Sequence, residues 1–267
     1  MDHYTHVCDA ADSVLDQTYN DTELVLISDG APAVFQAMKR DYGDRTDTVV
    51  GMTEENGGVS QSRNLGGELS HGEIIAFIDD DAVAEPDWIE ELLKGYEQHD
   101  ALAVGGKMIP RWIVGKPSFL PEEYYWLIGV THRGYPEEEA RVRNTWGSNF
   151  SVRHDIFEEL DGFDETLGRI ADKQVQGEEP EFGARLYETY GERMLYLPSA
   201  KVAHKVFDYR TDRWWLLNRA FWQGYSKYVM QTLLDDSGGE EDTFLRRLLI
   251  ESLPGRTKRL YQDPSKS

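Results

Sequence analysis

Short apolar runs that end in acidic residues recur along this chain and predict buried strands. In the clearest run, the five apolar residues of 74–78 are followed at once by Asp79, Asp80 and Asp81. A run this short and this rich in branched side chains is typical of a strand that is buried on both faces. Residues 23–28 form a second run, which ends in an Asp-Gly pair. Both runs predict strands with acids at their carboxyl ends.

Stretches with helical periodicity separate the apolar runs, and this β-α-β alternation favours a mainly parallel sheet. We therefore expect an α/β domain over residues 1–205, with a mainly parallel mixed sheet flanked by helices, and a helical segment over 206–267. Residues 110–145 are rich in Pro, Trp and Tyr, and we expect an irregular loop of the kind that often forms a lid. Further expected strands cover residues 48–51, 102–106, 150–152 and 192–198, and expected helices cover 9–19, 33–40, 86–99 and 154–160, with one more around residue 63 and one opened by 176–182.

The three acids after the strand cannot share its core, because desolvation and mutual repulsion would cost on the order of several kcal/mol. They therefore mark the carboxyl edge of the sheet, where open α/β sheets bind ligands. Three acids there indicate a hard divalent cation, which usually bridges to phosphate oxygens. The alternative is an acidic turn that caps the next helix, since Glu85-Pro86-Asp87 has the features of a helix start. A cap needs only one acid.

Two further residues are candidates for contact with a nucleotide. Asp29 follows a strand, where an acid often accepts hydrogen bonds from a ribose, although an Asp-Gly turn needs no ligand. The glycines of loop 55–58 would let its backbone approach a ligand closely. Arg63, in the helix that follows, could pair with a phosphate or stack near a base. The alternative is a flexible loop followed by a surface arginine.

Glu178 and Glu179 open a predicted helix, where the helix dipole stabilises acids without any function. Two adjacent carboxylates in a cleft also raise each other's proton affinity, so that one of them can act as a general base. The local sequence leaves both interpretations open. His204 follows the last predicted strand and could complete a metal shell, although a lone histidine is usually structural.

The charge balance excludes one class of partner. The chain has 49 acidic and 28 basic residues and a net charge of −21. Such a surface repels nucleic-acid phosphates, so we expect no nucleic-acid partner. It suits very high salt, where screening removes the self-repulsion, and so indicates a halophilic source. The single cysteine, Cys8, excludes an intramolecular disulfide framework and fits a reducing cytoplasm.

The C-terminal segment differs in character from the rest. Residues 212–230 have a helical pattern that is rich in Trp, Tyr, Arg and Lys, a combination that membrane–water interfaces favour. The alternative is that these aromatic side chains pack under the preceding domain. Residues 244–260 carry the basic cluster of this acidic chain, which is consistent with anionic lipid headgroups. We expect a cytoplasmic protein that is peripheral at the inner face of the cell membrane.

Taken in order, these features resemble the family 2 glycosyltransferases, which have the nucleotide-sugar-binding GT-A fold. The resemblance covers roughly residues 9–205. It rests on motifs that are each weak alone but keep the order and spacing of the family: Ser28-Asp29-Gly30, Asn56-Gly57 to Arg63-Asn64, Asp79-Asp80-Asp81, Gly147-Ser148-Asn149, Gly162-Phe163-Asp164 and Gly177-Glu178-Glu179.

The resemblance implies a metal-dependent, inverting transfer of a sugar from a nucleotide donor, expected to be a UDP-sugar, to an acceptor hydroxyl. The family usually has Glu-Asp where this chain has Glu178-Glu179, so Glu179 is the expected base and the choice between the two stays open. The donor-binding residues implied are Asp29, Arg63, Asp79, Asp80 and Asn149. The residues implied as ligands of Mn²⁺ or Mg²⁺ are Asp81, His204 and Asp79.

The C-terminal part is similar to a haloarchaeal subgroup of the family that extends dolichyl-phosphate-linked sugars in protein N-glycosylation and includes glucuronosyltransferases. This implies a lipid-linked sugar acceptor, although no residue here separates the donor sugars. One departure concerns the start of the chain. The family begins with a buried strand that forms a wall of the nucleotide pocket, and residues 1–6 correspond to the turn after it. We therefore expect either that the natural protein begins upstream or that this form is impaired.

Two other classes compete with this interpretation. A nucleotidyltransferase would share the metal, the phosphates and the sheet, but it normally carries a glycine-rich basic loop near its N-terminus, and the sequence has none. A non-catalytic subunit that binds a sugar nucleotide or a lipid would not turn over a donor. Another polysaccharide or glycolipid glycosyltransferase is the nearest alternative within the family.

Overall fold

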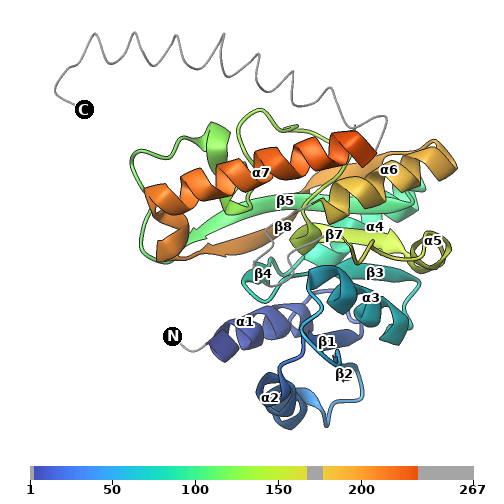
Figure 1. Cartoon of the computed structure of the whole chain (residues 1–267). Helices are drawn as coiled ribbons and strands as arrows, with labels where there is room; N and C mark the ends of the chain where they lie inside the picture. The colour runs from blue at the N-terminus through green and yellow to red at the C-terminus, as the bar shows by residue number, and fades with distance from the viewer. Residues whose placement is uncertain (1–2, 167–176, 234–267) are drawn as a thin grey trace, which may run out of the picture.

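Two sheets organise the fold of this computed structural model, which describes residues 3–166 and 177–233 (Figure 1). The small sheet pairs β1 (Leu24–Ser28) with β2 (Thr48–Met52) in parallel. The large sheet has the order β3-β7-β5-β8-β4, with β6 also paired to β8. Its strands are β3 (Ile74–Phe77), β4 (Ala82–Ala84), β5 (Ala103–Trp112), β6 (Ala140–Val142), β7 (Phe150–Arg153) and β8 (Met194–Val206).

The expected fold class is confirmed: a mixed sheet is flanked by helices. The expectation of mainly parallel pairing is wrong, because in the large sheet only β5 and β8 run parallel and every other pairing there is antiparallel. The physical reason is that β4, β6 and β7 follow turns and short irregular segments. Antiparallel pairs need no helical crossover, so a β-α-β pattern does not reveal them.

Helices cover the sheets where the periodicity predicted them. The first one begins at His3 rather than residue 9, because Val7, Ala10 and Val14 form a buried stripe at helical spacing. The helices are α1 (His3–Leu15), α2 (Pro32–Tyr42), α3 (Val59–Leu69), α4 (Trp88–His99), α5 (His154–Glu159), α6 (Glu178–Tyr190) and α7 (Arg213–Leu233), and the 3₁₀ turns are η1 (Glu122–Ile128), η2 (Gly147–Asn149) and η3 (Asp208–Thr211).

The last strand is longer than its sequence suggests. We expected it to end at Pro198, because proline has no N–H for a sheet ladder. Instead β8 continues to Val206, and its register with β5 shifts just after the Gly106–Leu197 pair. Pro198 lies in this bulge, where a missing donor is tolerated. The continuation places His204 opposite Ala82 of β4.

The segment 110–145 is more regular than predicted. Strand β5 extends into it as far as Trp112, and η1 and β6 follow. Ile128 and Val130 are fully buried in the main core, so this segment is built into the fold and is not a free lid.

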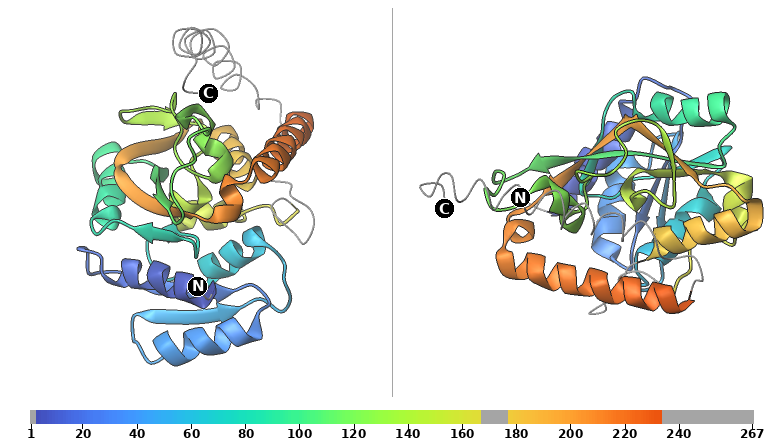
Figure 2. Two further views of the ribbon diagram at one scale, coloured as in Figure 1. Left: turned by 90° about the vertical axis from the view of Figure 1, so that its left-hand side faces the viewer. Right: turned by 90° about the horizontal axis from the view of Figure 1, so that it is seen from above.

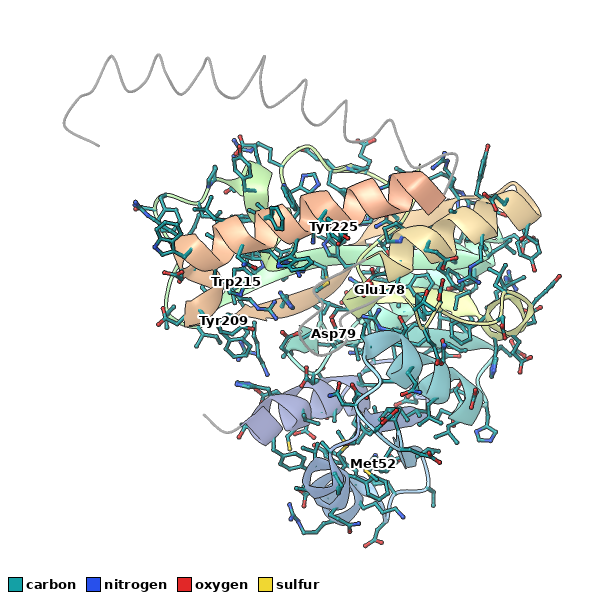
Figure 3. All side chains as sticks on the ribbon, viewed as in Figure 1. Met52, Asp79, Glu178, Tyr209, Trp215 and Tyr225 are labelled. Carbon is teal, nitrogen blue, oxygen red and sulfur yellow. The ribbon has the colours of Figure 1, made fainter. Side chains whose placement is uncertain are left out.

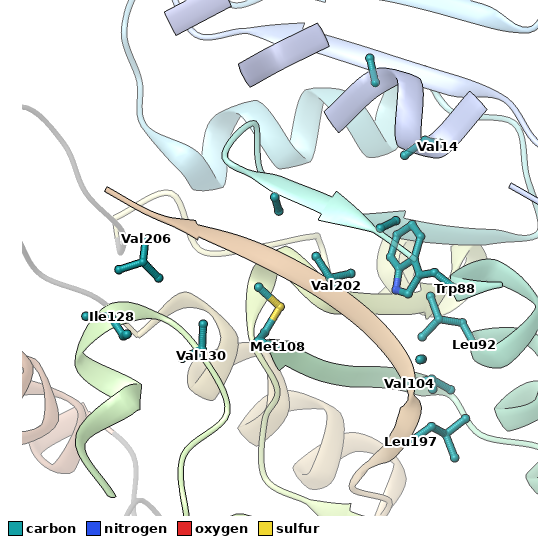
Figure 4. Packing of buried hydrophobic residues seen from close by; sticks show 14 of the residues in the cluster. Val14, Trp88, Leu92, Val104, Met108, Ile128, Val130, Leu197, Val202 and Val206 are labelled. Carbon is teal, nitrogen blue, oxygen red and sulfur yellow. The ribbon is translucent and has the colours of Figure 1, made fainter. Parts of the chain in front are cut away.

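The core fixes the strand ends where the acids lie. Trp88 is 1% exposed and packs with Leu92, Val104, Met108 and Val202 between α4 and the large sheet (Figure 4). Burying one such side chain stabilises the fold by roughly 2–3 kcal/mol. This layer holds β4 and β8 together directly behind the acidic turn 79–81.

Two strand edges face one another between the sheets. Among the described residues, β1 pairs only with β2, and β3 only with β7. The side chain of Ala76 in the middle of β3 is correspondingly exposed. Within the described part of the chain, these two facing edges therefore have no strand between them.

Helix α7 runs along the outside of the large sheet (Figures 1 and 2). Its buried Leu216 joins the main core, and the helix confirms the helical pattern predicted over 212–230. Asp212 caps it, since one carboxylate oxygen accepts the backbone N–H groups of Trp214 and Trp215, both at 2.9 Å. The basic cluster predicted in 244–260 lies outside the described residues.

Candidate functional site

Arg63 is the centre of a cluster of carboxylates. It projects from α3, is 9% exposed, and contacts acids from two other parts of the chain. Its Nη2 donates to Asp79 Oδ1 at 3.0 Å, and its Nη1 lies 3.4 Å from Glu179 Oε1 and 3.9 Å from Glu178 Oε1. A buried guanidinium with these neighbours stays charged. The sequence predicted a phosphate or base partner for Arg63, and the structure gives it carboxylate partners.

Asp79 and the glutamate pair come from elements that meet at one place (Figure 3). Asp79 lies two residues after the end of β3, and its backbone N–H donates to Ser148 Oγ at 3.1 Å. A Cβ on Gly147 would come within 2.4 Å of both Glu179 Oε1 and the Arg63 guanidinium, so any larger residue there would force these two side chains to move. The Gly-Ser pair of η2 therefore shapes this site through its backbone and one hydroxyl.

The two glutamates differ in their surroundings. Glu178 is buried, and its Oε2 accepts the backbone N–H of Gly177 at 3.0 Å. Glu179 is 20% exposed, and its Oε1 accepts the N–H of Gly147 at 2.8 Å. Burial and the neighbouring Glu178 raise the pKa of Glu179 to about 7, although Arg63 opposes this. A carboxylate with a pKa near neutrality that still reaches solvent is suited to accept a proton.

Asp81 and His204 form a second pair. Strands β4 and β8 bring His204 Nε2 to 3.2 Å from Asp81 Oδ1. Arg210 of η3 joins both, since its Nη2 donates to Asp81 Oδ2 at 2.7 Å and its Nη1 lies 2.9 Å from His204 Nε2. A histidine nitrogen that accepts a hydrogen bond has the lone pair that a metal ligand needs.

The residues present fit a divalent cation in part. The carboxylate oxygens of Asp81 and the imidazole nitrogen of His204 suit Mn²⁺. The positively charged guanidinium of Arg210 already contacts both side chains. Within the described ranges no group of three His, Cys, Asp or Glu side chains could hold a metal ion. Asp79 pairs with Arg63, whereas Asp81 and His204 contact each other, so the structure places two of the three predicted metal ligands in direct contact.

Asp29 orders the glycine loop. Its Oδ1 accepts the N–H of Gly57 at 2.9 Å, and its Oδ2 accepts that of Gly58 at 3.1 Å. Gly30 has φ of +58°, and a Cβ there would strike the backbone of Glu55 and Asn56. Asp29 therefore stabilises a turn, as one of the two sequence interpretations predicted, and it also lines the cleft. Its contact with a ribose stays a prediction.

Of the predicted donor-binding residues, Asn149 lies differently from expectation, whereas Asp80 lies at the cleft as expected. Asn149 is fully buried, and its amide is used by the protein: it donates to Ala200 O at 3.0 Å and to Lys107 O at 3.2 Å and accepts from Trp88 Nε1 at 2.8 Å. The structure does not bring this side chain to the site, because it closes the β8 bulge. Asp80 is exposed at the cleft.

Sequence reasoning missed Ser148 and Arg210. Ser148 belongs to a recognised motif but had no role assigned, and Arg210 lies among many arginines of the C-terminal segment. Only the proximity of Arg210 to His204, six residues earlier, could have singled it out.

One continuous cleft contains all of these groups except Asn149. Its volume of 2970 Å³ exceeds that of a small-molecule pocket, roughly 300–1,000 Å³. The excess arises because the cleft also runs along the facing edges of β1 and β3.

Comparison with known proteins gives a family match and several relatives. Residues 6–161 match the model of "Glycosyl transferase family 2". Glucosyl-dolichyl phosphate glucuronosyltransferase of Haloferax volcanii is 46% identical over 266 residues, which are 99% of this chain and 85% of that protein. Glycosyltransferase GlyA of Streptococcus pneumoniae is 25% identical over 227 residues, 80% of this chain and 30% of that protein.

The fold is also found among solved structures. The structure of residues 1–349 of S. aureus TarS in complex with UDP-GlcNAc superposes with a TM-score of 0.58 at 16% identity, and the match covers 77% of this chain and 56% of that one. At this identity the likeness shows the fold alone.

Proposed function

Since this chain belongs to glycosyl transferase family 2 and is a glycosyltransferase, we propose that it transfers a sugar, with inversion, from a UDP-sugar to the hydroxyl of a dolichyl-phosphate-linked sugar. The observation that carries the proposal is the chain of contacts Asp79–Arg63–Glu179. It joins an acid at the sheet edge, where a nucleotide would bind, to a carboxylate whose pKa is about 7.

The chemistry assigns one step to Glu179. Its carboxylate takes the proton of the acceptor hydroxyl as that oxygen forms a bond to the anomeric carbon. The bond from that carbon to the diphosphate breaks on the opposite face, and its electron pair leaves with the diphosphate. Gly147 N–H and Arg63 hold the Glu179 carboxylate in place for this transfer. Glu178 is the positioning partner, because its negative charge adds to the burial of Glu179 in raising the pKa of Glu179.

Asp81 and His204 are the residues that would hold Mn²⁺ or Mg²⁺. Such a cation neutralises the charge that develops on the leaving diphosphate.

The identity of the donor and acceptor rests on the relatives. The Haloferax volcanii relative is named for transferring glucuronic acid to glucosyl-dolichyl phosphate, and it covers almost the whole of this chain. The TarS structure contains UDP-GlcNAc. We therefore infer UDP-glucuronate as the donor and a dolichyl-phosphate-linked glucose as the acceptor.

The first prediction is that UDP is released only when this acceptor and Mn²⁺ are present together. The assay is run at high salt, to which the acidic surface is suited, with a panel of UDP-sugars. Asp81→Asn should lower turnover about 10²-fold or more, because it removes a negatively charged ligand of the cation. Asp87→Asn makes the same charge change at an exposed position outside the cleft and should leave turnover unaltered.

Each result of this assay has a distinct meaning. Release with another UDP-sugar would keep the family chemistry and reject glucuronate as the donor. UDP binding without release from any donor and acceptor would reject the transferase proposal in favour of a binding subunit. Equal turnover by Asp81→Asn and Asp87→Asn would reject the assigned cation site.

We also propose that α7 contacts the membrane surface that presents the acceptor. Its Trp214, Leu217, Phe221 and Tyr225 follow one another at spacings of three and four residues and are 78%, 61%, 67% and 46% exposed. They form one apolar stripe on the outside of the molecule, and this spacing places them on one face of a helix. Large exposed apolar stripes mark sites of interaction, and Trp and Tyr favour the membrane interface.

None of the helices in the described ranges combines the length and apolar character needed to cross a bilayer.

The second prediction concerns this stripe. The double substitution Trp214→Ser and Phe221→Ser should reduce binding to vesicles roughly tenfold or more, because it removes two large apolar side chains from the contact. Flotation with neutral and with anionic vesicles at high salt measures this. Tyr187→Ser removes an exposed aromatic side chain from α6 and serves as the control. Undiminished flotation of the double variant would exclude the stripe as the contact.

A further inference from the structure

Arg210 is placed where a cation is proposed to bind. Its side chain is 13% exposed, so it is held in the protein and does not extend into solvent. The guanidinium spans Asp81 Oδ2 at 2.7 Å and His204 Nε2 at 2.9 Å, and its Nε donates to Tyr209 OH at 3.0 Å. Asp81 is itself 15% exposed. A carboxylate this enclosed needs a positive partner, since an unpaired buried charge is costly.

The guanidinium and a metal ion would require the same atoms. A divalent cation held by Asp81 and His204 needs an oxygen of Asp81 and the Nε2 lone pair of His204, and Arg210 engages both. Two positive groups cannot share these atoms, because their repulsion is strong in a site with little water. Arg210 therefore has to leave before the cation can be bound by both side chains.

A nucleotide diphosphate would give Arg210 another partner. Arg210 lines the same cleft as Asp79 and Glu179. It is carried by η3, a four-residue turn between β8 and α7, so a small change in this turn would move the side chain along the cleft. The planar guanidinium matches phosphate oxygens as well as carboxylate oxygens.

We propose that Arg210 is a placeholder cation: it occupies Asp81 and His204 until a divalent cation and a nucleotide diphosphate bind together, and it then pairs with the diphosphate. This rests on the proposed function, which supplies both ligands. Its consequence is that cation and nucleotide bind cooperatively, because the diphosphate both ligates the cation and receives the arginine that the cation displaces.

The test measures Mn²⁺ binding without any turnover. Electron paramagnetic resonance gives the fraction of free Mn²⁺ in titrations with and without UDP. Arg210→Gln removes the charge and keeps much of the side chain. Without UDP it should bind Mn²⁺ about tenfold or more tightly than the unmodified protein, because no guanidinium competes. The gain in Mn²⁺ affinity that UDP produces should be correspondingly smaller in this variant.

The control is Arg40→Gln. It makes the same change in net charge at an exposed arginine that pairs with Asp41, and it should bind Mn²⁺ like the unmodified protein. Equal Mn²⁺ affinities of the two glutamine variants without UDP would overturn the placeholder. Failure of the unmodified protein to bind Mn²⁺ even with UDP would instead overturn the metal site of the proposed function, and the placeholder with it.

A second variant covers the case in which Arg210→Gln does not fold. Arg210→Lys keeps one positive charge but cannot span Asp81 and His204 with a planar fork. It should bind Mn²⁺ without UDP more tightly than the unmodified protein does. An affinity equal to that of the unmodified protein would count against the placeholder.

Discussion

Replacing Glu179 with glutamine should lower kcat about 10³-fold while leaving the affinity for UDP unchanged. A general base typically contributes about 10²–10⁴-fold to a rate, and glutamine keeps the size and the contacts of the side chain but cannot accept the proton. Turnover and UDP binding of the variant, measured side by side, test this. A rate within a few-fold of the unmodified protein would remove Glu179 as the base.

The control is the neighbouring substitution Glu178→Gln. Glu178 is buried against the Gly177 N–H and Arg63 and has less access to an acceptor. Its loss should reduce kcat much less and should lower the pKa of Glu179, because Glu178 is one cause of the raised value. If Glu178→Gln were the inactive variant instead, the roles of the two residues would be reversed.

The pH dependence provides a second readout of the same residue. The base must be deprotonated, so kcat/KM of the unmodified protein should rise with pH and level off above about 7. The sign for stability is opposite. The folded protein holds a proton between 4.5 and about 7 that the unfolded chain has released, so this group costs stability as pH rises through that window. Glu179→Gln removes this pH-dependent loss of stability. Above about pH 7 the variant should be at least as stable as the unmodified protein.

Replacing Arg63 with methionine should destabilise the protein by about 3 kcal/mol, the scale observed when one partner of a buried ion pair is removed. The change leaves Asp79, Glu178 and Glu179 close together without their shared cation. Since Asp79 is 38% exposed, solvent screens part of this repulsion. Urea unfolding followed by circular dichroism measures the loss.

The loss should grow as pH rises toward neutrality. Without Arg63 the pKa of Glu179 would be higher still, because the charge of Arg63 is the larger of the two effects that lower it. Glu179 of the folded variant would then keep its proton over a wider pH range, and the stability of the variant would fall as pH rises through that range. Arg45→Met, which breaks an exposed pair with Asp47, should cost less than about 1 kcal/mol at any pH. A cost for Arg63→Met no larger than this control's would show that the cluster needs no cation.

A large part of the fold was predictable because individual strands and helices follow from the local pattern of apolar and polar residues. The apolar runs before Asp29 and Asp79 gave two strands, and helical periodicity gave the helices of the N-terminal half. Strand direction was not predictable in this way. The antiparallel strands β4 and β7 follow turns, and their partners β8, β3 and β5 are fixed by long-range hydrogen bonds.

The candidate site also has features that the sequence determines and features that depend on the tertiary structure. The sequence by itself determined which chemical groups are available: the acids at strand ends, the glutamate pair at a helix start, and the order of motifs that indicates the family. The tertiary structure decided which groups meet. Arg63 pairs with a carboxylate 16 residues away and with another 116 residues away, and no local pattern carries that information.

Burial also separated residues that look alike in the sequence. Asn149 and Asp79 both belong to family motifs, but packing against Trp88 makes one a structural amide, whereas the strand end leaves the other at the cleft. In the sequence, Arg210 does not stand out from the other arginines. In the structure, β8 places His204 beside Asp81, and the guanidinium of Arg210 contacts both. The physical reason is common to these cases. Residue type and spacing fix what a side chain can do, but desolvation and distance, which depend on the whole fold, fix what it does.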